Sequence, residues 1–419
     1  MLIPAHKQSR DWTVLYYGGG VNNLDQDIRE AWAGLADEKR PANVDTFVRH
    51  IDQHGQSQDI HIGPEQEKRI LCSDSGPVDS SDPDTLTEFI RKGVSNYPAK
   101  HYLVVLSSHG RGAEGVLEDD LQNSIMRPHE LRAALEAGKQ ANRGRPLDAV
   151  LFDACRMAAV EMASELVGST LITVASMDSI ADAGYDLGDA LEAASKSEDA
   201  LELGRRLVHN DSNRQLDTLN SISAVDLSKI PDLETSWAKF TEQIQKVDKE
   251  GLELLALHAR DSRRNRPSPL AEYGNDLLAD SILGTPNDNN KTALELWLLN
   301  QAPGDAVAIV SFCNRILSDQ GLLERFPGLG DAAVGVVESH DATVFAYRTQ
   351  DRLEDPGGLT VSLPLKNQVG PLYDSPLNFA RTTGWESGYN AVLPDGEQIP
   401  IEKSWLEREI ERPHRPPVS

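Results

Sequence analysis

The stretch LDAVLFDACRMAAVEMASEL, residues 147–166, constrains the fold more than any other part of the chain. Its apolar run at 149–152 ends at Asp153, and apolar residues then recur at helical spacing from Met157 to Leu166. A short apolar run followed by a helical period predicts a buried strand that turns directly into a helix. Such units build mostly parallel sheets, in which the carboxyl ends of the strands form the binding edge.

Cys155 follows this strand by two residues, at the predicted start of the helix. Backbone N–H groups and the helix dipole favour a thiolate there. The alternative is a buried apolar role, which free cysteines usually have. A catalytic partner is available in His109, which follows the apolar run 103–106 and precedes Gly110. Because neighbouring strands lie ~4.8 Å apart, a His and a Cys at two strand ends can face one another.

Strand-like and helix-like segments alternate through the first 230 residues. Strands are expected at 12–18, 60–62, 68–71, 103–106, 149–152, 171–175 and 221–225. Helices are expected at 24–35, 43–51, 85–95, 128–135, 157–166, 189–195 and 200–209. This alternation predicts an α/β fold with a mostly parallel sheet and helices on both faces.

The texture changes after residue 231, where amphipathic helices over 231–263 and strands at 343–348 and 359–363 predict an α+β region. Residues 306–317 fit either a helix or a strand. A chain of 419 residues exceeds one ordinary core. We expect four parts. They are an N-terminal extension at 1–10, a catalytic domain at 11–230, a C-terminal domain packed on it at 231–411 and a disordered tail at 412–419.

The formal net charge of −25 argues against nucleic acid or an anionic membrane as a partner and suits basic substrates. No run approaches the ~20 apolar residues that a membrane span needs. Three cysteines, Cys72, Cys155 and Cys313, give no disulfide framework. The first residues contain no apolar segment typical of a secretion signal. We therefore expect a cytoplasmic protein, although a trimmed, secreted mature form is the alternative.

Six segments, in order, resemble the clostripain family of cysteine peptidases, in the caspase-like and gingipain-like clan. They are WTVLYYGGGVNNLD from residue 12, DPDTLTEFIRKGVSNYPAKHYLVVLSSHG from 82, LFDACRMAAVEMASEL from 151, SISAVDLSKIPDL from 221, GGLTVSLP from 357 and FARTTGW from 379. The third contains the family's Asp-x-Cys-x-Met-x-x-x-Glu pattern as Asp153, Cys155, Met157 and Glu161. The resemblance implies a caspase-like fold and cysteine endopeptidase activity.

The implied chemistry is attack of the Cys155 thiolate on the scissile carbonyl to form an acyl-enzyme. His109 would act as general base and acid, chiefly to protonate the leaving amine. The backbone N–H groups of Gly110 and Cys155 would bind the oxyanion. Because thiol and imidazole need not be hydrogen-bonded in this clan, we expect no triad. Other histidines lack the strand-end glycine context and are interpreted as structural or surface residues: His61, His101, His129, His209, His258 and His340.

Asp153 either caps the following helix or forms the floor of the primary specificity pocket. A buried carboxylate needs a cationic partner, which a substrate side chain would supply. The resemblance implies protein or peptide substrates cleaved after Arg or Lys. A second acidic residue is expected in the loop after the next strand, where Asp182 is preferred to Asp178.

The resemblance also implies activation by self-cleavage between the His and Cys segments. Lys139, Arg143 and Arg145 are the candidate sites, and a simple basic loop is the alternative. The chemistry requires no cofactor or metal. Calcium activation is implied by the family, but no D-x-D-x-D-G loop marks a site.

Arg156 stands where relatives often have an apolar residue, and the family is often secreted. A different class of function is a catalytically silent caspase-like interaction module, or a zymogen in intracellular signalling or defence. A preference for acidic substrates, as in caspases, would be opposed by Asp153 and Asp182.

Overall fold

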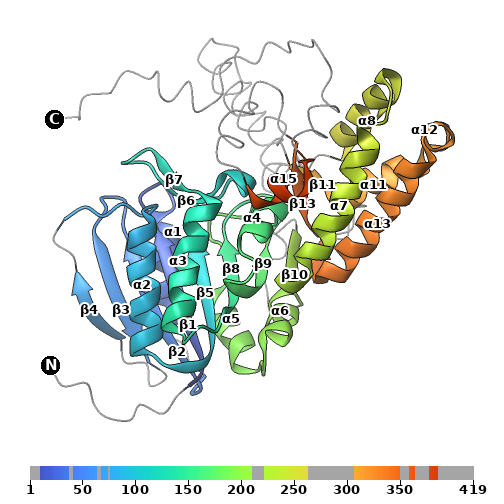
Figure 1. Ribbon diagram of the computed structural model, residues 1–419. Helices are drawn as coiled ribbons and strands as arrows, with labels where there is room; N and C mark the ends of the chain where they lie inside the picture. Colours follow the sequence, from blue (N-terminus) through green and yellow to red (C-terminus); the bar gives the residue numbers. More distant parts are fainter. Residues whose placement is uncertain are drawn as a thin grey trace, which may run out of the picture.

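A mixed sheet of nine strands crosses the molecule in the order β12-β10-β9-β8-β5-β1-β2-β3-β4 (Figure 1). This computed structural model describes residues 10–36, 41–63, 68–73, 76–209, 221–262, 306–349, 358–363 and 377–385. The strands are β1 Arg10–Gly19, β2 Val44–Ile51, β3 Ser57–Ile62, β4 Lys68–Ser73, β5 Ala99–Ser107, β8 Leu147–Asp153, β9 Thr170–Ala175, β10 Ser221–Asp226 and β12 Val344–Thr349. The five strands β2, β1, β5, β8 and β9 are parallel, so the mostly parallel core of the sheet is confirmed.

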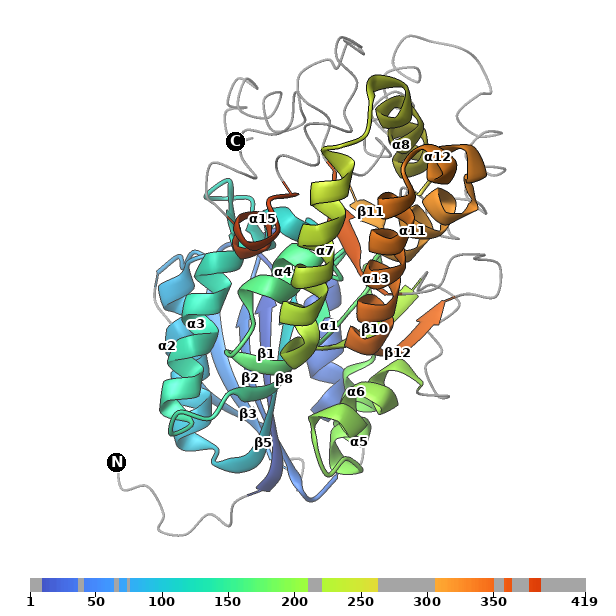
Figure 2. The same cartoon turned by 45° about the vertical axis from the view of Figure 1, so that its right-hand side comes forward.

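Helices cover both faces of this sheet (Figures 1 and 2). One face packs against α1 Asp25–Ala33, α5 Leu187–Ser195 and α6 Ala200–Val208. The other packs against α2 Pro83–Asn96, α3 Pro128–Ala141, α4 Val160–Glu165 and α7 Ile230–Ile244. Alternating residues of a strand enter the two cores, as Val150 and Leu151 do in β8. Asp153, two residues after Leu151, therefore faces the α1, α5 and α6 side.

The helix expected over residues 43–51 is wrong, because this segment is strand β2. Its apolar residues Val44, Phe47, Val48 and Ile51 fall at helical spacing. The strand lies between β1 and β3 and is buried on both faces, so both faces take apolar residues and no alternation is visible. Backbone pairing with two neighbouring strands decides the conformation.

The region after residue 230 is built around the same sheet. Its described elements are α7, α8 Lys249–Asp261, β11 Ala306–Ala308, α11 Ile309–Ser318, α12 Gln320–Arg325, α13 Pro327–Thr343, β12, β13 Thr360–Ser362 and α15 Asn378–Thr383. The undecided segment at 306–317 is thus a three-residue strand followed by a helix. Strand β12 pairs with β10 at one edge of the sheet, and residues of α7, α11 and α13 belong to the same apolar core as β8. The region predicted as a C-terminal domain therefore shares its core with the rest of the chain, and the expected tail lies outside the described residues.

A small two-stranded sheet pairs β11 with β13 (Figure 1), and Thr360 of β13 forms a bridge with Ala159 at the start of α4. The N–H of Thr360 donates to the carbonyl of Ala158 at 2.8 Å. The N–H of Ser362 donates to the buried Glu161 carboxylate at 2.6 Å. The segment directly after Cys155 is thus hydrogen-bonded to β13, about 200 residues further along the chain.

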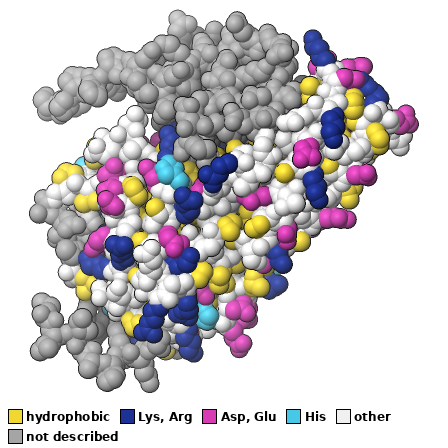
Figure 3. Space-filling model, viewed as in Figure 1, with side chains coloured by type: hydrophobic (Ala, Val, Ile, Leu, Met, Phe, Trp, Pro, Cys, Tyr) yellow, Lys and Arg dark blue, Asp and Glu magenta, His cyan; other side chains and the backbone are white. Residues whose placement is uncertain are grey.

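Charged side chains of both signs are interspersed on the face drawn in Figure 3, which shows no large area of one sign. None of the helices in the described ranges is long and apolar enough to cross a membrane.

Candidate active site

The loops that carry His109 and Cys155 leave the sheet side by side. Strands β5 and β8 are parallel neighbours, and their last residues, Ser107 and Asp153, lie opposite one another. The N–H of Ser108 donates to the carbonyl of Asp153 at 3.3 Å. Because both strands end at the same level, the two predicted catalytic residues follow at the carboxyl ends of the parallel strands.

Gly110 lets these two loops touch. A Cβ atom at position 110 would lie 2.6 Å from the carbonyl oxygen of Cys155 and 2.7 Å from Sδ of Met157. Only a residue without a side chain fits this contact, because the nearest atom belongs to the backbone. The glycine after His109 therefore brings the histidine loop onto the cysteine loop.

The backbone N–H groups of Gly110 and Cys155 are both without a protein acceptor among the described residues. Gly110 faces Val116 in an antiparallel bridge whose hydrogen bonds are made by its neighbours, His109 O and Arg111 N. The Gly110 N–H consequently points away from that bridge. Backbone donors without a protein acceptor are what an oxyanion needs.

The thiol of Cys155 is half-buried and lies against the loop after β9. Its Sγ accepts a hydrogen bond from the N–H of Ile180 at 3.4 Å. Burial raises the pKa of the Cys155 thiol, and the Ile180 backbone contact and the charge of Arg156 oppose this rise only in part. The resting thiol is therefore more protonated than an exposed cysteine.

The expected placement of Cys155 at a helix N-terminus is wrong. Helix α4 begins at Val160, five residues later, and is only six residues long. The intervening backbone bonds elsewhere: Arg156 N donates to Asp178 O at 3.0 Å, and Ala158 N to Ser176 O at 2.9 Å. These contacts with the loop after β9 delay the helix, so its dipole does not lower the pKa of the thiol.

His109 is half-buried, and its Nε2 lies 2.8 Å from Oδ1 of Asn23. Asn23 belongs to the turn between β1 and α1, on the other side of β5 from Cys155. No hydrogen bond joins His109 to Cys155, both of which the structure describes. Sequence reasoning missed Asn23, although it stands in the quoted VNNLD turn after a strand neighbouring that of His109.

Asp153 is a buried carboxylate, with 6% of its surface exposed. Ser107 Oγ donates to Oδ2 at 2.7 Å, and the N–H of Tyr185 donates to Oδ1 at 2.8 Å. Burial raises the pKa of Asp153 to about 6, against the lowering effect of these two hydrogen bonds. It does not cap α4, whose N-cap is Ala159 without a side-chain bond. Within the described ranges no basic side chain pairs with it.

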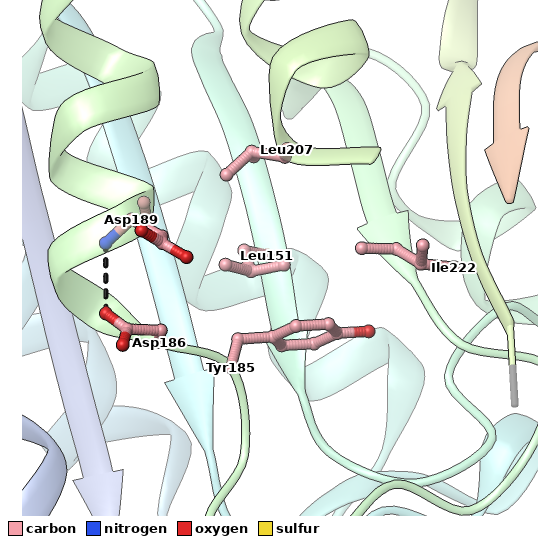
Figure 4. A pocket seen from close by; sticks show the side chains of 7 residues that line it. Leu151, Tyr185, Asp186, Asp189, Leu207 and Ile222 are labelled. Carbon is pink, nitrogen blue, oxygen red and sulfur yellow. Dashed lines mark hydrogen bonds between the residues drawn. The ribbon is translucent and has the colours of Figure 1, made fainter. Parts of the chain in front are cut away.

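The loop 180–185 covers this carboxylate. A Cβ atom at Gly184, whose φ is +65°, would lie 2.3 Å from Oδ1 of Asp153. The ring of Tyr185 then turns into the core, where it lines a small pocket of about 10 Å³ (Figure 4). The other lining residues are Leu151, Asp186, Asp189, Ala190, Leu207 and Ile222. In this conformation a group from outside the protein would contact Asp153 only after the loop had moved.

The two other acidic candidates differ in exposure. Asp178 is buried, and its Oδ2 accepts a hydrogen bond from Ser221 Oγ at 2.7 Å. Asp182 is exposed in the loop 180–185. Burial is the main cause of the raised pKa of the Cys155 thiol, and the negative charge of Asp182 adds to it.

The candidate self-cleavage residues lie in a compact turn. Lys139 is in the last turn of α3, and Arg143, at φ +59°, follows the helix end. Asn142 Nδ2 donates to the carbonyl of Arg145 at 3.1 Å and closes the turn. The turn leads into the first residue of β8 and so lies at the amino end of this strand. Cys155 follows the carboxyl end, about 20 Å away along the strand.

The remaining histidines occupy structural positions where the structure describes their contacts. His61 pairs with Asp45, His101 with Asp148, His258 with Asp319, and His340 with Asp341. Nowhere in the described ranges do three or more His, Cys, Asp or Glu side chains gather to hold a metal ion. Calcium activation stays a prediction without a site.

Comparison with known proteins gives a family and a set of similar folds. A family model described as the clostripain family matches residues 24–293, more than half of the chain. A secreted C11 cysteine protease from Bacteroides thetaiotaomicron, in complex with an irreversible peptide inhibitor, is 16% identical with a TM-score of 0.61, covering 90% of this chain and 99% of that one. A search of curated proteins gave no match.

Two further structures have similar folds. An inactive zymogen C11 protease from Parabacteroides distasonis is 18% identical with a TM-score of 0.57, over 94% of this chain and 100% of that one. The secreted C11 cysteine protease iotapain from B. thetaiotaomicron is 14% identical with a TM-score of 0.59, over 92% and 100%. At these identities the likeness establishes the fold alone, and this fold agrees with the one predicted from the sequence. The cytoplasmic location finds no support in these comparisons, because two of these proteins are described as secreted.

Proposed function

This chain belongs to the clostripain family and is a cysteine peptidase, and from that premise we propose that it cleaves peptide bonds after Arg or Lys, with Cys155 as nucleophile and His109 as proton-transfer residue. One observation carries the proposal. The His109 and Cys155 loops meet at the ends of neighbouring strands, and the N–H groups of Gly110 and Cys155 have no protein acceptor among the described residues. This arrangement supports assigning the nucleophile, the base and the oxyanion donors to these two loops.

The reaction begins with transfer of the thiol proton to His109, which the raised pKa of Cys155 makes necessary. Sγ bonds to the scissile carbonyl carbon, and the two free N–H groups stabilise the oxyanion, each worth about 3 kcal/mol. Protonated His109 gives its proton to the amine nitrogen as the C–N bond breaks. Water then adds to the thioester, passing a proton to His109, and the acid product and thiol are released.

Asp153 supports a preference for basic substrates. It is a buried negative charge that no described basic residue neutralises. A substrate guanidinium or ammonium group would compensate this charge, whereas a carboxylate would be repelled. The loop 180–185 must open first, and Asp182 in that loop would then join Asp153 on the cationic side chain. Asp178 is the less favoured second acid, because Ser221 already bonds it.

Self-cleavage at Lys139, Arg143 or Arg145 would require a second molecule. These residues lie near the amino end of β8, whereas Cys155 follows its carboxyl end. They belong to the last turn of α3 and to the tight turn after it. Peptidases bind their substrates extended, so the turn would also have to unfold locally. We infer that activation, where it depends on cleavage within one molecule, uses a different bond.

The test is cleavage of fluorogenic peptides ending in Arg, Lys, Asp or Leu by the wild type, Cys155→Ala and His109→Ala. Each protein is assayed with calcium and with a chelator, and a gel is run in parallel. We expect cleavage after Arg or Lys that both variants lose. Cleavage after Asp would contradict the assigned pocket. Silence of a folded wild type on all peptides would instead favour a zymogen or a silent interaction module.

A further inference from the structure

Asn23 is bonded to the proposed catalytic histidine from the side opposite the nucleophile. Its Oδ1 lies 2.8 Å from Nε2 of His109. Because a carboxamide oxygen only accepts hydrogen bonds, this contact fits the tautomer that carries its proton on Nε2. The other ring nitrogen, Nδ1, is then the one with a free lone pair in the neutral imidazole.

The neighbouring residue, Asn22, fixes this turn against the histidine loop. Asn22 is buried, and its Nδ2 donates to Gly19 O at 3.1 Å, Ser108 Oγ at 3.1 Å and Glu118 O at 2.9 Å. Its Oδ1 accepts from the N–H of Leu24 at 3.0 Å. Ser108 directly precedes His109, so one side chain ties the Asn23 turn to the loop that carries the imidazole.

We propose that Asn23 is a positioning residue for catalysis, which holds His109 in the tautomer and orientation that expose Nδ1 to the thiol and to the leaving amine. This inference rests on the proposed role of His109. The high pKa of the thiol makes the arrangement consequential, because the proton has to move to a nitrogen whose lone pair is free. An uncharged amide fixes the ring without the strong stabilisation of imidazolium that a carboxylate would give.

The test compares Asn23→Leu and Asn23→Asp with Gln26→Leu in the full chain. Gln26 lies three residues further on, and among the described residues its side chain bonds only Glu30, so it controls for local disturbance. Leucine removes the acceptor; we expect kcat to fall about 10- to 100-fold with little change in KM, as part of the gain from general acid–base catalysis. Aspartate keeps the acceptor; we expect activity within about 3-fold of the wild type at its optimum and a pH profile displaced upward, because the carboxylate raises the pKa of the imidazole.

A second readout does not depend on turnover. In Cys155→Ala protein labelled with ¹⁵N-histidine, the His109 signals are identified by their loss in His109→Ala. We expect an Nε2–H imidazole with Asn23 and a mixture of tautomers with Asn23→Leu. A fully active His109→Ala enzyme would refute the proposed function itself. Wild-type kinetics and an unchanged tautomer in folded Asn23→Leu, with His109→Ala inactive, would refute only the role of Asn23. Should the leucine variant not fold, an unmoved pH profile in Asn23→Asp would refute it.

Discussion

Replacing Asp153 by asparagine should stabilise the folded protein and abolish the proposed preference for basic substrates. The carboxylate is buried without a described cation, and its pKa is raised from the ordinary 3.8 to about 6. At 1.36 kcal/mol per pKa unit, this difference corresponds to about 3 kcal/mol. Asparagine carries no charge and keeps both contacts, since Oδ1 accepts from Tyr185 N–H and Nδ2 donates to Ser107 Oγ.

The sign of the effect depends on pH. Below pH 3.8 the carboxyl is protonated in both the folded and the unfolded chain and contributes nothing. As the pH rises from 3.8 to about 6, the unfolded chain loses this proton while the folded protein keeps it, so the wild type loses stability. Above pH 6 the full penalty of about 3 kcal/mol is present.

The assay is urea unfolding of Asp153→Asn against the wild type, both carrying Cys155→Ala so that no proteolysis intervenes. We expect equal stability near pH 4 and an advantage of about 3 kcal/mol for the variant at pH 8. Peptide cleavage by Asp153→Asn with Cys155 intact should lose most of its selectivity for Arg over Leu. A variant no more stable at pH 8 than at pH 4, relative to the wild type, would show that the buried charge is neutralised and refute the reasoning.

Three further substitutions test the contacts around the site. Gly110→Ala places a Cβ atom 2.6 Å from the Cys155 carbonyl, so we expect at least a ~100-fold loss of kcat/KM as the oxyanion donors are displaced, measured on an Arg peptide. Gly184→Ala, at φ +65° and in collision with Asp153, should displace the loop 180–185 and raise the exchange rate of the Tyr185 N–H, measured by hydrogen exchange. Glu161→Ala removes the buried acceptor of the Ser362 N–H and should cost about 1–3 kcal/mol in urea unfolding.

Local pattern was sufficient to predict the elements whose periodicity is unambiguous. The β8 strand, the His109 and Cys155 positions at strand ends and the helices on both faces follow from apolar spacing. The same rule failed for residues 43–51, where burial on both faces of β2 produces helical spacing by coincidence. Periodicity reports which positions are buried, and a strand inside a sheet is buried all round.

The remaining features depend on contacts between distant segments, which no local pattern contains. The bond from His109 to Asn23 joins residues 86 positions apart. The late start of α4 depends on carbonyls of Ser176 and Asp178 that capture the N–H groups after Cys155. The distance of Lys139, Arg143 and Arg145 from Cys155 could, however, have been predicted from the sequence. A turn that leads into a parallel strand lies at the amino end of that strand, and Cys155 follows the carboxyl end.

The loop that carries Cys155 is completed by residues synthesised long after it. Ala158, three positions past Cys155, is paired with Thr360, 202 residues further along the chain. At translation rates of ~5–20 residues per second, roughly 10 to 40 s pass between the emergence of the two segments from the ribosome. During this interval the Cys155 loop lacks its hydrogen bonds to strand β13. The order of synthesis therefore imposes a delay, in which the nascent chain already carries the Cys155 thiol but lacks the strand that fixes its loop.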